Sequence, residues 1–144
     1  MSIADFGLVK ALFKGGKLSE EKENELFAEL LYMVLTRATA ADLNIESVEV
    51  QAVIKILKEQ LNQDFTEKDI RVAALSDLYN IEPFERCVGK IGRKLTLVHR
   101  TSILHALVEV FKSDGGVGVL EAEYFNNVVN ALQLTPAQII GLQK

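Results

Sequence analysis

The chain is poor in cysteine and proline. Cys87 is the only cysteine among 144 residues, so an internal disulfide and a thiolate metal cluster are both excluded, and a reducing, cytoplasmic location is favoured. The two prolines, Pro83 and Pro136, leave long segments free to form helices. No linker rich in serine, glycine and proline divides the sequence. We therefore expect residues 1–144 to form a single domain.

Long apolar runs and excess positive charge are also missing. No uninterrupted apolar stretch approaches the roughly 18 residues of a membrane span, so no transmembrane segment is predicted. The net charge is −4, whereas proteins that bind a phosphate backbone need clustered lysine and arginine. The densest basic stretch, residues 90–100, lacks interleaved aromatic residues that could stack on bases. We expect no nucleic-acid partner.

The sequence does carry helical periodicity. Hydrophobic residues make up 49% of the chain, they recur at helical spacing, and no stretch alternates with a period of two. These patterns predict a compact all-α fold of about eight helices. The segment 19–41 has the broadest apolar face, which indicates a central helix with neighbours on several sides. The expected helices cover residues 2–13, 19–41, 47–61, 66–79, 83–94, 96–113, 119–132 and 135–142.

An acidic signature occurs twice. In each copy an aspartate ends a long helical segment and a glutamate follows seven residues later, as Asp42 with Glu49 and as Asp114 with Glu121. Both acids repeat at an offset of 72 residues, and the flanking apolar positions match at the same offset. This indicates a duplication within the chain. The two related halves span about residues 19–61 and 96–132.

Two interpretations of these acids remain open. Helix-end chemistry explains them without a ligand, because aspartate can fold a tight turn and a first-turn glutamate favours the positive end of a helix. Carboxylates are also the oxygen ligands that divalent cations such as calcium prefer. The EF-hand pattern is absent, since Val53 stands where its bidentate glutamate belongs. If a divalent cation is the cofactor, its predicted ligands are Asp42, Glu49, Asp114 and Glu121.

The second acidic copy resembles the tellurite-resistance TerB family. The matching residues are Asp114-Gly115-Gly116-Val117, Glu121 and the segment 132–139, and the likeness covers roughly residues 22–142. The first copy departs from the family pattern, with Leu43 where glycine is usual. The resemblance implies an all-helical domain of two related halves, without enzymatic activity, associated with tellurite and general stress responses. It also implies a protein partner at the cytoplasmic membrane surface and a metal ion as a suspected ligand.

No catalytic constellation accompanies these features. Neither a strained nucleophile turn nor a phosphate-cradling loop occurs, and His99 and His105 are expected to be partly buried core residues. The main hypothesis is a non-catalytic, TerB-like interaction module. The alternative is a small helical enzyme that uses Glu49 or Glu121 as a base in a cleft between the halves. The sequence carries no signal for an oligomeric state.

Overall fold

The helices follow the periodicity of the sequence. A computed structural model describes residues 20–40, 47–75, 84–113, 119–135 and 137–138, and within them it contains six α-helices and no strand. The all-α prediction is therefore confirmed for this part of the chain. The helices expected over 2–13 and 135–142 lie wholly or largely outside the described residues. The six helices are α2 (Glu20–Ala38), α3 (Ser47–Leu61), α4 (Glu67–Ala74), α6 (Phe84–Gly92), α7 (Leu97–Lys112) and α8 (Val119–Ala131).

Capping residues set where helices begin. The Thr66 hydroxyl accepts the backbone N–H of Asp69, and the Asp69 carboxylate accepts the N–H of Thr66, which makes a capping box at the start of α4. In the same way, the Thr96 hydroxyl accepts the N–H of His99 at the start of α7. Local polar chemistry thus marks both boundaries, and at α7 the Thr96 N–H also donates to the Glu23 carboxylate of α2 at 3.1 Å.

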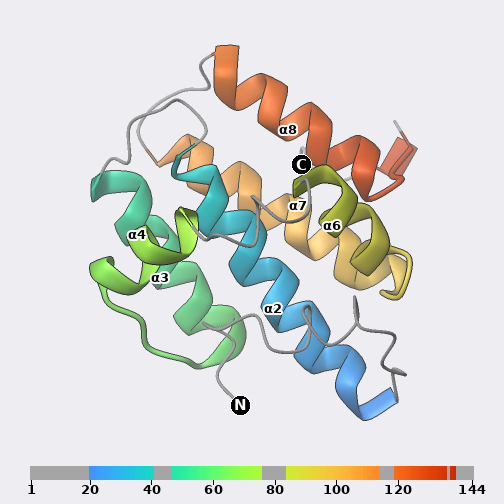
Figure 1. The fold of residues 1–144 in the computed structure, drawn as a ribbon, viewed down its shortest axis with the longest axis horizontal. Helices are drawn as coiled ribbons and strands as arrows, with labels where there is room; N and C mark the ends of the chain where they lie inside the picture. The colour runs from blue at the N-terminus through green and yellow to red at the C-terminus, as the bar shows by residue number, and fades with distance from the viewer. Residues whose placement is uncertain (1–19, 41–46, 76–83, 114–118, 136, 139–144) are drawn as a thin grey trace.

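Helix α2 is the centre of the fold. It packs against all five of the other described helices (Figure 1). Its consecutive residues 32–35 point to different sides of the helix, and each is 0% exposed. A helix that is buried all round needs apolar neighbours on every side. The prediction of a central helix is therefore confirmed.

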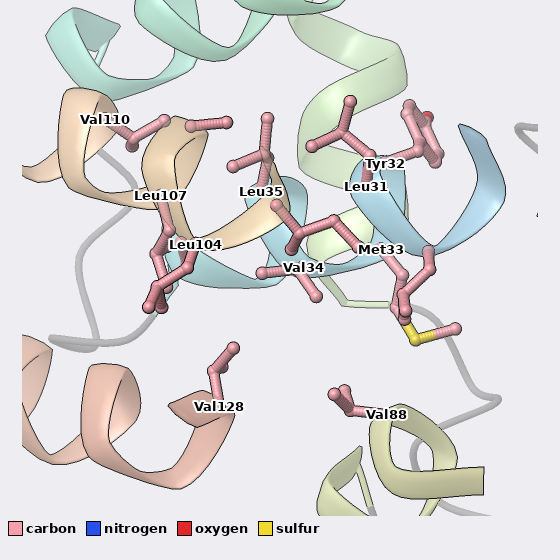
Figure 2. Packing of buried hydrophobic residues seen from close by; sticks show 14 of the residues in the cluster. Leu31, Tyr32, Met33, Val34, Leu35, Val88, Leu104, Leu107, Val110 and Val128 are labelled. Atoms are coloured by element: carbon pink, nitrogen blue, oxygen red, sulfur yellow. The ribbon is translucent and has the colours of Figure 1, made fainter. Parts of the chain in front are cut away.

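The remaining helices supply those neighbours. Figure 2 shows Val88 of α6 and Val128 of α8 pointing towards Val34 of α2, with Leu104 and Leu107 of α7 beside it. All five side chains are at most 1% exposed. One continuous core thus joins helices that are far apart in the sequence.

Long polar side chains connect the backbones of different helices. The Tyr124 hydroxyl of α8 donates to the carbonyl of Val34 at 2.6 Å. The guanidinium of Arg100 in α7 donates to the carbonyl of Leu132, just past the end of α8, at 2.8 Å. The Arg100 bond satisfies a carbonyl beyond the end of α8 that has no partner within the helix, whereas the Tyr124 bond reaches a carbonyl inside α2.

Helices α6 and α8 approach each other closely at two glycines. A Cβ atom added at Gly92 would stand 3.1 Å from Cδ2 of Leu132, which is tighter than ordinary contact. At Gly89, the nearest atom would be the Ala131 carbonyl oxygen at 3.6 Å, which is an ordinary contact. Only Gly89 therefore has room for a methyl group.

Replacing Gly89 by alanine is expected to raise the free energy of unfolding by about 0.5–1 kcal/mol, because alanine reduces the conformational freedom of the unfolded chain. The matched change Gly92→Ala should gain less or should destabilise, since the Leu132 side chain must move. Urea unfolding of both variants would check this difference. A larger gain at Gly92 than at Gly89 would contradict the packing of α6 on α8.

Candidate functional site

Two of the four acids predicted as ligands are buried at helix starts. Glu49 lies in the first turn of α3 and is 0% exposed, and Glu121 lies in the first turn of α8 and is 4% exposed. Their predicted first-turn positions are therefore confirmed. The other two acids, Asp42 and Asp114, lie outside the described residues.

The two glutamates occupy the same position in their helices. Helix α3 begins at Ser47 and α8 begins at Val119, so each glutamate is the third residue of its helix. There the positive end of the helix favours a carboxylate. Burial of a carboxylate is nevertheless costly unless polar groups or cations compensate it, and neither glutamate is without an interaction partner.

Both helix starts lie towards the same end of the molecule. In Figure 1, α3 and α8 begin at the upper left of the view, where α2 and α7 end. Within the described residues, no three His, Cys, Asp or Glu side chains come together as a metal-binding group. A cation site that includes the two glutamates would thus require further ligands from outside the described residues, where Asp42 and Asp114 lie.

The two histidines have different surroundings. The His99 ring stacks on Phe27 with a centroid distance of 4.4 Å, and its Nδ1 lies 3.6 Å from a Glu23 carboxylate oxygen. The prediction of a partly buried histidine is confirmed here. It is wrong for His105, whose side chain is 52% exposed and whose Nε2 lies 3.1 Å from Glu109. Position 105 is on the side of α7 that no other described helix covers, so its side chain reaches solvent.

Two surface grooves flank the last turns of α7. The groove between α3 and α7 has a volume of about 360 Å³ and a mixed polar lining that includes Lys55, Glu59 and Glu109. The groove between α7 and α8 has a volume of about 210 Å³. Its lining residues are Val108, Phe111, Lys112, Ala122, Phe125 and Asn126. Among their described lining residues, neither groove includes Glu49 or Glu121.

The α7–α8 groove was not predicted from the sequence. Its apolar residues follow the same helical spacing as core residues, and a pattern in one helix cannot indicate whether a neighbour covers that face. The one available signal was the register of the two acidic copies. At the offset of 72 residues, the groove residues Val108 and Phe125 correspond to Thr36 and Val53 of the first half, so the two surfaces can be compared.

Comparison with known proteins identifies the family. No described helix is long and apolar enough to cross a membrane. Searches of curated proteins and of solved structures gave no match. The family model "Tellurite resistance protein TerB" matches residues 28–144, which covers α3, α4 and α6–α8 entirely and most of α2. The chain therefore belongs to the TerB tellurite resistance family.

Proposed function

We propose that this chain is a non-catalytic interaction module of the tellurite and stress response that binds a divalent cation through its duplicated acids. The ligands are Asp42, Glu49, Asp114 and Glu121. The observation that carries the proposal is the burial of two glutamates, each the third residue of a helix that begins at the same point of an acidic signature. The module works in the cytoplasm and contacts a protein partner at the cytoplasmic membrane surface.

The chemistry of the donors supports a hard cation. Carboxylate oxygens and loop carbonyls are the ligands that calcium and magnesium prefer. A nearby divalent cation also offsets the free energy that burial of Glu49 and Glu121 costs. A bound cation would favour the ionised carboxylates and link Asp42 and Asp114 to the helix starts that follow them.

The duplication supports a pair of related corners. Helices α3 and α8 begin 72 residues apart, which equals the offset between the acids. The halves at about 19–61 and 96–132 would then be two copies of one helical unit within a single domain, and each copy would contribute one aspartate and one glutamate.

Calorimetric titration with calcium, magnesium, zinc and manganese tests the cation. Asp114→Asn combined with Glu121→Gln is expected to weaken binding by more than about tenfold, because a neutral amide replaces each charged ligand. The matched control is Glu123→Gln, which changes an exposed acid of the same helix. It should leave the affinity unchanged.

Wild-type protein that gives no heat and no thermal stabilisation with any of the four metals would reject the cation. The acids would then act as helix caps, and the interaction module would remain. The enzyme alternative, with Glu49 or Glu121 as a base, gains no support from the two grooves, because neither includes these glutamates among its described lining residues.

A further inference from the structure

The groove between α7 and α8 is an open apolar pocket on the surface. Four of its six described lining residues are apolar, with Lys112 on α7 and Asn126 on α8 completing it. Engineered apolar cavities of about 150 Å³ in other proteins bind benzene. A groove of about 210 Å³ is therefore large enough for one branched or aromatic side chain of a partner.

The matching surface of the first half is covered. The residues 72 positions before the apolar lining are all 0% exposed: Thr36, Thr39, Val50 and Val53. Helix α4 packs against both α2 and α3 there. Arg37 of α2 donates to the Ala74 carbonyl at 2.9 Å, and Arg71 of α4 donates to the Ser47 hydroxyl at 3.5 Å. The C-terminal part of α4 thus lies beside both the end of α2 and the start of α3.

The second half has no equivalent cover within the described residues. Among the described helices, only α2 packs substantially against both α7 and α8, and it does so from the core side. Figure 1 shows α8 at the edge of the molecule, whereas α4 lies beside α2 and α3. Among the described helices, α4 therefore covers this surface on the first half, and none covers the corresponding surface on the second half.

We propose that the α7–α8 groove receives a short amphipathic helix of a partner protein, in the place that α4 takes over α2 and α3. This inference rests on the proposed function as an interaction module, and it names the class of partner. The geometry of α4 defines the recognition chemistry. One large apolar residue of the partner helix enters the pocket and is the counterpart of Ile70, which is fully buried in α4. Small residues three and four positions later allow the helices to approach closely, as Ala73 and Ala74 do in α4.

Charge favours an acidic partner helix. Lys112 is exposed at the groove, and no carboxylate of the described residues pairs with it. A glutamate or aspartate on the partner helix would meet this ammonium group. The partner is therefore a helix with an apolar stripe at positions i, i+3 and i+4 and a carboxylate beside that stripe.

A synthetic peptide of residues 64–75, which carries the α4 stripe and the acids Glu67 and Asp69, is the probe. Added to the full-length isotope-labelled protein, it should give saturable amide chemical-shift changes at Val108, Lys112 and Phe125. Ala122→Asp places a charge in the groove and should lower the affinity for the peptide probe by about tenfold or more. Lys112→Glu changes an exposed residue and should leave the fold intact. It should lower the affinity for the probe by about threefold.

The matched control is Val98→Asp. Val98 is 71% exposed on α7 and does not line the groove, so the same type of substitution should leave probe affinity unchanged. Shift changes that do not saturate, or that centre outside the groove, would overturn the proposal.

Other occupants give different results. A chain shortened after Gln138 that binds the probe at least tenfold more tightly would assign the groove to residues 139–144. Concentration-dependent shifts at the groove without peptide would assign it to a second copy of the chain. Either result overturns docking of a partner helix. Cation titration is measured separately, so loss of probe binding with intact cation binding rejects only the docking site.

Discussion

Replacing Leu104 by alanine is expected to lower the free energy of unfolding by about 3 kcal/mol. Leu104 is 0% exposed, and it lies in the core beside Val34 of α2. Removing its side chain forfeits burial of apolar surface and leaves a cavity, because the packed helices relax only in part. For a chain of this length the melting temperature should fall by about 10 °C. Urea unfolding and a thermal scan would measure both quantities.

A leucine in the same helix provides the control. Leu97 begins α7 and is 42% exposed, so Leu97→Ala should lower the free energy of unfolding by less than about 1 kcal/mol. Equal losses at the two positions would mean that α7 does not bury the face assigned to it. A change in the urea m-value would instead indicate an altered unfolded state.

Replacing Glu49 by alanine is expected to lower the free energy of unfolding by about 2 kcal/mol. A carboxylate at 0% exposure is retained where polar partners compensate its burial, and its removal leaves those partners unsatisfied. The change also removes an acidic residue from the first turn of α3. Chemical unfolding in a buffer with a metal chelator would measure the loss.

The exposed Glu25 in the second turn of α2 is the matched position, where alanine should change the free energy of unfolding by less than about 0.5 kcal/mol. Added cation separates the two roles of Glu49. If the carboxylate is a ligand, a saturating cation should stabilise the wild type by about 2.7 kcal/mol at a hundred times its Kd. The Glu49→Ala variant should gain much less. A neutral effect of Glu49→Ala in the chelator buffer would contradict the structural role, and equal stabilisation of both proteins by cation would contradict the ligand role.

The candidate site was predictable in part. The sequence indicated that Glu49 and Glu121 lie in the first turns of helices, because a first-turn acid before an apolar run is a local signal. Their burial was not predictable, since Glu67 in the first turn of α4 has the same local signal and is only partly buried. The exposure of His105 was not predicted either, because the local pattern does not show which side of α7 a neighbouring helix covers.

Local information was sufficient for the helices themselves. The spacing of apolar residues and the capping by Thr66 and Thr96 depend on neighbours within a few positions, so the sequence by itself determined the all-α class and the six described helices. Tertiary packing decided what each helix face contacts. It covers α2 and α3 with α4, whereas no described helix covers the groove of α7 and α8. The physical reason is that burial depends on residues that are distant in the chain, and a pattern within one helix is the same whether its apolar face meets a neighbour or solvent.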